Sequence, residues 1–212
     1  MDFDDIFLLL LRILKSSREA RQMVARSFES GTVDEYQDVS AAQHAVLKFW
    51  TSSAESVCVV GDPSQTINSL AGSSSWFLEH AKGDFPPPYR QISLTSNYRS
   101  GREIIRWANS VLAPSSKKYV RLQPALRSKG SVSKESFSDF SSLAKRAAEL
   151  AQNGDKEKSI AILARSRRDL EALKKELSSR FVPFSDLERP QEGGVLLSTK
   201  HAAKGLEWDR VI

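Results

Sequence analysis

Short apolar runs that end in polar loops recur along the chain, and this pattern constrains the fold more strongly than any other feature. The run from Val57 to Val60, closed by Gly61-Asp62-Pro63, shows the pattern most clearly. A continuous β-branched run without alternation is typical of a strand buried on both faces of a parallel sheet. Because helical spacing alternates with such runs, the sequence predicts an α/β fold with a mainly parallel sheet.

The expected elements follow from apolar spacing and from Gly, Pro and Ser punctuation. Helices are expected at residues 2–28, 41–51, 74–82, 102–112, 141–152 and 169–177. Strands are expected just before residue 33 and at residues 57–60, 92–94, 160–163, 195–198 and 210–212. The three prolines at residues 86–88 mark a candidate domain boundary, and residues 185–194 are expected to form a loop.

The composition is that of an ordinary globular chain, with 40% hydrophobic and 27% charged residues. The net charge of +5 permits nucleic-acid binding without requiring it. A single cysteine, Cys58, excludes an internal disulfide and favours a reducing compartment, so a cytoplasmic location is expected. We expect Cys58 itself to be a small buried apolar residue rather than a nucleophile.

The apolar segment from Ile6 to Leu11 is far shorter than the roughly 20 residues that span a bilayer. Acidic residues at its start also differ from the basic beginning of a signal peptide. We therefore expect a buried helix here and no contact with a membrane.

Residues 34–38 (Asp-Glu-Tyr-Gln-Asp) place adjacent carboxylates directly after an apolar stretch that ends at Val33. Neighbouring carboxylates repel each other unless a cation is close, and hard cations such as Mg²⁺ take oxygen ligands. In phosphoryl-transfer sites one carboxylate holds the metal while a neighbouring polar group orients the attacking water. A solvated acidic turn is the alternative interpretation when these residues are taken alone.

Four polar loops follow expected strands in order, and open α/β sheets bind ligands outside the carboxyl ends of their strands. They occupy residues 34–38, 61–66, 95–100 and 198–208. The loops together resemble the motifs of the UvrD/Rep family of superfamily 1 DNA helicases. The family pattern Asp-Glu-Phe/Tyr-Gln-Asp matches the first loop, and Val-Gly-Asp-x-x-Gln-x-Ile matches the second. Asn-Tyr-Arg-Ser matches the third, and Thr-x-His-x-x-Lys-Gly-Leu-Glu matches the fourth.

A fifth segment, Asp2-Phe3-Asp4-Asp5-Ile6, is similar to a family segment just upstream, so the resemblance covers nearly the whole chain. It implies a RecA-like fold in two lobes. Residues 1–88 would be the C-terminal part of the first lobe, and residues 89–212 most of the second, without the large inserted helical domain. It also implies an ATP-dependent DNA helicase or translocase that uses ATP and Mg²⁺ and acts on single-stranded or partly duplex DNA.

The resemblance assigns a role to each matching residue around the nucleotide. Asp34 would coordinate Mg²⁺, and Glu35 would position or deprotonate the attacking water. Gln65 would sense the γ-phosphate, Arg99 would act as an arginine finger, and Tyr98 would stack on adenine. Taken singly, Arg99 is more simply a surface arginine, and Tyr98 a core aromatic.

Residues of the fourth loop have implied roles at the ribose and the DNA. Glu207 would contact the ribose, while Thr199, His201 and Lys204 would line the lobe interface or the DNA track. Taken alone, His201 is more simply a packing or capping residue.

The sequence departs from the family pattern at positions that ATP hydrolysis and DNA binding require. No Gly-x-x-x-x-Gly-Lys-Ser/Thr run occurs in the sequence, and relatives' last motif would lie beyond Ile212. The base-stacking aromatic and the arginine that relatives carry after Ile67 are replaced by residues 68–72. We therefore expect this chain alone to be inactive as an ATPase. A non-catalytic module that binds DNA or a partner is the alternative, and an unpaired strand edge would favour a homodimer.

Overall fold

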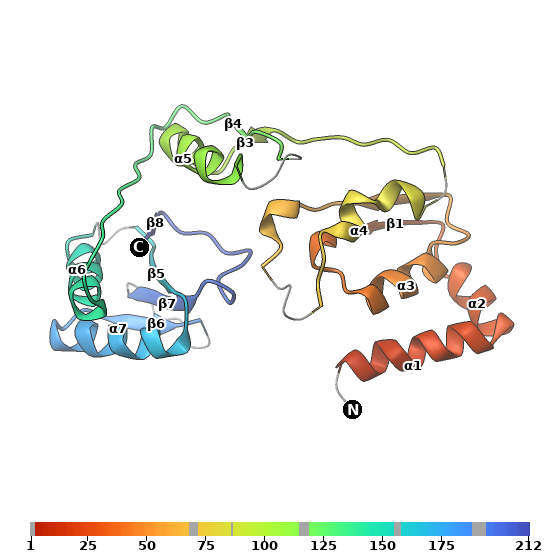
Figure 1. The fold of residues 1–212 in the computed structure, drawn as a ribbon, viewed down its shortest axis with the longest axis horizontal. Helices are drawn as coiled ribbons and strands as arrows, with labels where there is room; N and C mark the ends of the chain where they lie inside the picture. Colours follow the sequence, from red (N-terminus) through yellow and green to blue (C-terminus); the bar gives the residue numbers. More distant parts are fainter. Residues whose placement is uncertain (1–2, 68–71, 86, 115–118, 155–157, 188–193) are drawn as a thin grey trace. The chain divides into compact units, whose positions relative to one another are not determined.

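The computed structural model describes residues 3–67, 72–85, 87–114, 119–154, 158–187 and 194–212, with the backbone alone at residues 3 and 4. The replaced aromatic segment after Ile67 lies mostly outside these residues. The chain divides into two compact units, Met1–Val132 and Ser133–Ile212, each described here by itself (Figure 1). The expected lobe boundary between residues 88 and 89 is a different division and stays a prediction.

Two helices open the first unit where one was expected. They are α1 (Phe3–Ser16) and α2 (Arg18–Ala25). Ser17 divides them because its side-chain oxygen caps α2 by accepting a hydrogen bond from the Ala20 amide at 3.1 Å. Leu14 is fully buried, but Leu8 and Leu9 are half exposed. The prediction of a buried helix is therefore wrong for one face of α1, since only the other face packs on its neighbours.

A two-stranded parallel sheet carries the acidic loop. It pairs β1 (Ser30–Val33) with β2 (Ser56–Val59). Successive residues of a strand point to opposite faces, and one face of this sheet is exposed. Cys58 lies opposite Thr32 on that exposed face, so the prediction that Cys58 is buried is wrong.

Short helices follow the two strands of this sheet along the chain. They are α3 (Ala41–Trp50), α4 (Trp76–Glu79) and the 3₁₀ turns η1 (Tyr36–Asp38), η2 (Pro63–Gln65) and η4 (Ala81–Gly83). Helix α3 confirms the expected helix and begins with a capping box, in which Ser40 and Gln43 each bond the other's backbone. The helix expected over residues 74–82 is interrupted at His80.

The rest of the first unit holds a second small sheet and one helix. Strand β3 (Ser96–Asn97) pairs in parallel with β4 (Gln123–Pro124), and α5 (Arg102–Leu112) confirms the expected helix. The strand expected at residues 92–94 does not form: Ile92 and Leu94 are 65% and 82% exposed. A strand needs a paired neighbour, which apolar composition alone does not supply.

The second unit is a four-stranded parallel sheet with two helices packed on it (Figure 1). The strands are β5 (Ile160–Ala164), β6 (Phe184–Asp186), β7 (Val195–Thr199) and β8 (Arg210–Val211), in the order β6-β7-β5-β8. The helices are α6 (Phe140–Gln152) and α7 (Arg167–Ser179). Strand β6 occupies part of the segment expected to be a loop.

The core of the second unit is built mainly from apolar side chains. Its buried members are Ala144, Ala147, Ala148, Ala151, Ile160, Ile162, Ala164, Leu173, Leu177, Val182, Val195 and Leu197. Strand β5 is buried along almost its whole length, as expected for a parallel strand covered on both faces. The alternation of strands and helices confirms the predicted α/β class, in its RecA-like form. Within the described residues, no helix is both long and apolar enough to cross a membrane.

Candidate functional site

The acidic loop begins where β1 ends, at the carboxyl edge of the β1–β2 sheet. Asp34 and Glu35 are both exposed there, and the Glu35 amide donates a hydrogen bond of 2.8 Å to Asp34 Oδ1. Glu35 has φ 52° and ψ 37°, in the left-handed region. A residue with a Cβ rarely adopts this conformation, and such backbone strain is concentrated at functional sites.

Gln37 joins the acidic loop to the loop that follows β2. Its side chain is fully buried; Nε2 donates to the Glu35 carboxylate, and Oε1 accepts a bond of 3.0 Å from the Asp62 amide. A Cβ at position 61 would collide with Gln37 Oε1, so Gly61 allows this close approach. The sequence alone indicated no role for Gln37. An amide between acids, followed by a second loop that starts with glycine, is the signal that could have revealed it.

The second loop places Gln65 at the same edge of the sheet. Asp62 caps η2, with Oδ1 accepting from the Ser64 amide at 2.9 Å and Oδ2 from Gln65 Nε2 at 3.0 Å. The Val60 amide donates to Val33 O at 2.8 Å, which keeps the two strand ends together. The structure therefore brings Asp34, Glu35 and Gln65 to one edge.

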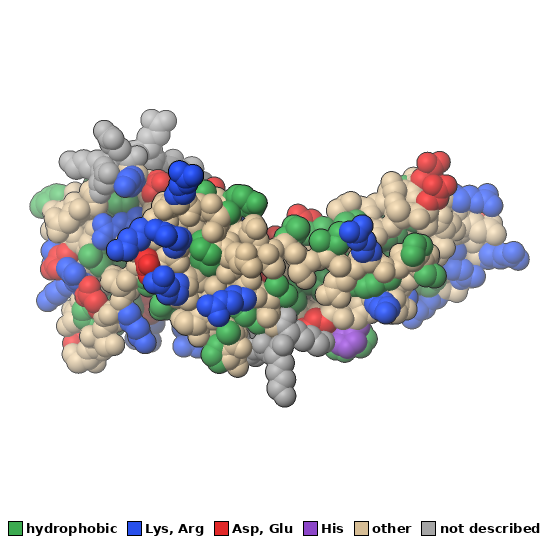
Figure 2. Space-filling view, turned by 90° about the horizontal axis from the view of Figure 1, so that it is seen from above, with side chains coloured by type: hydrophobic (Ala, Val, Ile, Leu, Met, Phe, Trp, Pro, Cys, Tyr) green, Lys and Arg blue, Asp and Glu red, His purple; other side chains and the backbone are tan. Residues whose placement is uncertain are grey.

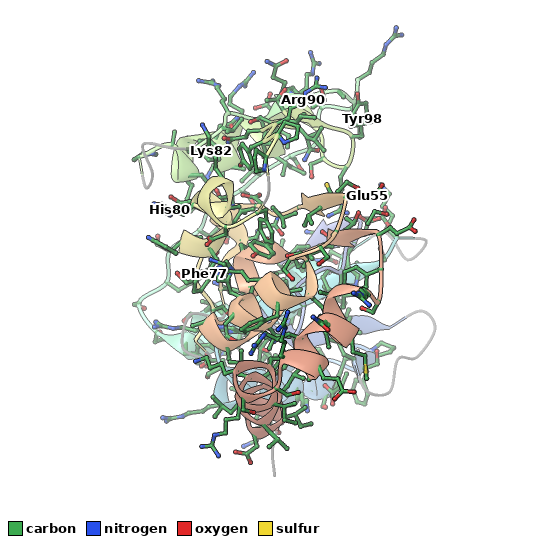
Figure 3. All side chains as sticks on the ribbon, turned by 90° about the vertical axis from the view of Figure 1, so that its right-hand side faces the viewer. Glu55, Phe77, His80, Lys82, Arg90 and Tyr98 are labelled. Atoms are coloured by element: carbon green, nitrogen blue, oxygen red, sulfur yellow. The ribbon has the colours of Figure 1, made fainter. Side chains whose placement is uncertain are left out.

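The third loop is an Asx turn that exposes two of the expected site residues. Asn97 Oδ1 accepts from the amides of Arg99 at 3.1 Å and Ser100 at 2.8 Å. Tyr98 is 75% exposed, so it does not belong to a core (Figure 3). Arg99 is also exposed. This turn belongs to the first unit.

The fourth loop follows β7 in the second unit and gathers three expected DNA-binding residues in one turn. Thr199 Oγ1 accepts from the Ala202 amide at 3.2 Å, and the Lys204 amide donates to His201 O at 3.3 Å. His201 and Glu207 are exposed, and Lys204 is partly buried.

The end of this loop is tied back to the start of β5. Asp209 Oδ2 accepts from the Ser159 amide at 2.9 Å and from the Ser159 hydroxyl at 2.8 Å. These hydrogen bonds from Ser159 lower the pKa of Asp209 below its usual value. The anchor joins residues separated by 50 positions, so it orders the segment that carries Glu207.

A pocket of about 470 Å³ opens in the second unit beside the carboxyl ends of β5 and β7. Its lining includes the apolar side chains of Phe140, Leu143 and Leu173. Arg165 and Lys200, which follow β5 and β7, also line it. Figure 2 shows basic side chains spread widely over the face that it draws, with acidic ones among them. The pocket thus offers cationic groups next to an apolar surface.

The acidic loop fits a magnesium–nucleotide complex better than a free metal ion. Among the described residues, no group of three or more His, Cys, Asp or Glu side chains could hold a metal. Mg²⁺ bound to a nucleotide needs only one or two carboxylates, because phosphate oxygens and water supply the other ligands. The exposed carboxylate of Asp34 meets that requirement. The sequence has no glycine-rich Gly-x-x-x-x-Gly-Lys-Ser/Thr loop to cradle the phosphates.

Comparisons with known proteins assign both parts of the chain to one family. Residues 1–86 match the family model described as the UvrD/REP helicase N-terminal domain. Residues 92–191 match the model described as the UvrD-like helicase C-terminal domain. The two matches together include every expected site residue except those of the fourth loop.

Individual relatives agree with these models. A protein named "Probable DNA helicase II homolog" from Mycoplasma capricolum is 29% identical over 189 residues, which is 87% of this chain and 26% of that relative. "ATP-dependent DNA helicase PcrA" of Staphylococcus aureus is 31% identical over 118 residues, or 56% of this chain and 16% of that relative. This chain thus spans about a quarter or less of the length of these relatives. The chain belongs to the UvrD/Rep family of helicases.

Proposed function

We propose that this chain is part of an ATP-dependent DNA helicase or translocase, which couples ATP hydrolysis to movement on single-stranded DNA and to duplex unwinding. The observation that carries the proposal is the carboxyl edge of the β1–β2 sheet. There two exposed carboxylates and Gln65 lie on loops that Gln37 joins. The names of the relatives support the same activity.

In this proposal Asp34 holds Mg²⁺ and Glu35 acts on the attacking water. Mg²⁺ bound with ATP supplies positive charge to the phosphate oxygens. The Glu35 carboxylate can accept a proton from water, and Gln37 orients it by donating a hydrogen bond. Gln65, held by Asp62, has an amide that can contact the γ-phosphate.

The remaining expected residues complete the proposal from their own loops. Arg99 stabilises charge on the transferred phosphoryl group, and Tyr98 stacks on adenine; their exposure on an ordered turn supports both roles. Glu207 contacts the ribose. Thr199, His201 and Lys204 contact the DNA, and their position in one turn supports a shared role.

We also propose that this chain by itself does not hydrolyse ATP, because its sequence has no Gly-x-x-x-x-Gly-Lys-Ser/Thr loop to bind the phosphates. The test is calorimetry of the chain with Mg²⁺-ATP, followed by a titration with single-stranded DNA. We expect no ATP binding, and DNA binding that weakens as salt is added. ATP binding would contradict the expected inactivity, and absence of DNA binding at low salt would contradict the DNA role. ATP-independent DNA binding would also suit a non-catalytic module, which the Glu35 variant described below distinguishes.

We also propose that this chain forms a homodimer through a sheet edge. Among the described strands, β1 and β2 pair only with each other, so each presents an outer edge. Such edges favour pairing with a second chain. A strictly monomeric species in sedimentation at high concentration would count against the dimer. We also propose a cytoplasmic location, since the single cysteine suits a reducing compartment.

A further inference from the structure

A network of polar side chains begins in the acidic loop at Tyr36 and reaches the surface at Lys48. The Tyr36 hydroxyl is 2.8 Å from His44 Nδ1, and His44 Nε2 is 3.4 Å from Asp84 Oδ2. Lys48 Nζ is 2.7 Å from Asp84 Oδ1. Tyr36 is fully buried and His44 is 7% exposed. This network connects η1 to α3 and to the segment after η4.

With a neutral imidazole, one placement of protons satisfies every member of this network. Lys48 can only donate, so Asp84 accepts as a carboxylate. In a neutral His44, Nε2 then carries the proton that faces Asp84, and Nδ1 is the acceptor. The Tyr36 hydroxyl therefore donates to His44 Nδ1. In this arrangement the imidazole is neutral and holds one specified tautomer.

The surroundings favour the same protonation states. The Phe77 ring stacks on His44 with centroids 4.4 Å apart, and the Phe85 ring lies 6.1 Å from that of Tyr36. Figure 3 labels Phe77 on α4. Burial lowers the pKa of His44, although Asp84 opposes the shift. Burial, together with the charge of Asp84, raises the pKa of Tyr36 to about 12.

Tyr36 is held at both of its ends, and it directly follows the strained residue of the site. Its amide donates to Val60 O at 2.9 Å, and its hydroxyl donates to His44. Glu35, the preceding residue, keeps its left-handed conformation at φ 52°. Such a conformation persists only where the surrounding contacts determine it.

We propose that Tyr36 and His44 are positioning residues that hold Glu35 in its left-handed conformation and so aim its carboxylate. The purpose of that carboxylate rests on the proposed function, but the conformational link does not. His44 acts through Tyr36, so its tautomer sets the geometry of a residue that it does not touch.

The test is NMR spectroscopy of the 212-residue chain without nucleotide, comparing Tyr36→Phe with the unmodified protein. The variant keeps the ring and removes the donor. We expect the backbone couplings and shifts of Glu35 to move away from positive φ. Amide exchange at residues 35–38 should rise by about tenfold, as one lost hydrogen bond predicts.

Tyr119→Phe is the matched control. It also removes a phenol donor, which bonds Asn109 Oδ1 at 2.6 Å in the same unit. We expect this control to leave Glu35 unchanged. Unchanged Glu35 couplings and exchange in folded Tyr36→Phe would overturn the proposal, as would an equal change in the control.

A measurement on the unmodified chain keeps the proposal testable if the variant does not fold. Nitrogen-15 shifts of His44 at neutral pH should report a protonated Nε2 and an unprotonated Nδ1. The opposite tautomer, or a doubly protonated ring, would overturn the proposed proton order. Because no nucleotide is present, failure of these results is distinct from failure of the proposed hydrolysis.

Discussion

The two parallel sheets of this protein are held in place by different forces. The four-stranded sheet of the second unit is ordered by an apolar core, with Leu177 and Leu197 almost completely buried. The β1–β2 sheet of the first unit is half exposed, and its loops are ordered by hydrogen bonds of Gln37, Tyr36 and His44. Polar substitutions should therefore act at the first sheet, and loss of apolar volume at the second.

The largest effect is expected for Glu35→Gln in a form of the protein that hydrolyses ATP. Removal of a general base lowers turnover by about a hundredfold or more, while nucleotide binding should remain. Steady-state ATPase assays with calorimetric binding measure both quantities. Asp186→Asn, an acid-to-amide change in the second unit, is the control and should leave turnover unchanged. Unchanged turnover in Glu35→Gln would contradict the role of Glu35 in water activation.

Leu177→Ala in α7 tests the contribution of the apolar core to the second unit. Truncation of this fully buried side chain should reduce the free energy of unfolding of the second unit by about 2–5 kcal/mol. Leu8→Ala on the half-exposed face of α1 is the control, and its effect should be much smaller. Urea denaturation monitored by residue-resolved NMR separates the two units. Equal losses in both variants would contradict the expected contribution of the buried Leu177 side chain.

Arg99→Ala should lower ATP turnover by at least about tenfold, at the lower end of the effects of arginine fingers. In the proposed role the guanidinium would lose its contact with the transferred phosphoryl group, whereas folding should not change because Arg99 is exposed. The control is Arg106→Ala on α5, where the arginine bonds Glu103 at 2.8 Å. A negligible change in the Arg99 variant, measured in the same ATPase assay, would exclude the finger role.

The smallest effect is the dependence of stability on pH at the first sheet. Burial lowers the pKa of His44 in the folded state below 6.5, so the unfolded state binds the proton more readily as pH falls. The free energy of unfolding of the first unit should therefore rise with pH up to about 6.5 and then level off. The groups that face His44 are Tyr36, Asp84 and Lys48.

The measurement is urea denaturation at several pH values between about 5 and 7. Asp84 does not reverse the trend in this range. Burial raises its pKa, but the hydrogen bond from Lys48 and the neighbouring His44 outweigh burial and keep that pKa below its usual value. His44→Phe, which retains the ring stack, should remove this pH dependence. A stability that falls with rising pH would show that His44 is protonated in the folded protein.

Local sequence patterns predicted most of the helices and the buried strands. The helices expected at residues 41–51, 102–112 and 141–152 appear almost as predicted, because their apolar spacing is local. Errors occurred where a distant partner decides the outcome. Residues 92–94 lack a strand partner, and β6 forms because β7 pairs with it.

The sequence by itself determined the chemistry of the site: adjacent carboxylates after a strand, polar loops at strand ends, and motifs that identify the family. Tertiary structure decided how those groups are held. Gln37 meets Asp62 across 25 residues, and Lys48 meets Asp84 across 36. Hydrogen bonds over such separations depend on how elements pack, and no local pattern encodes them. Tyr36 and His44 are only eight residues apart, but their hydrogen bond forms because η1 folds against α3, so the proposed link to Glu35 also emerges only from the folded chain.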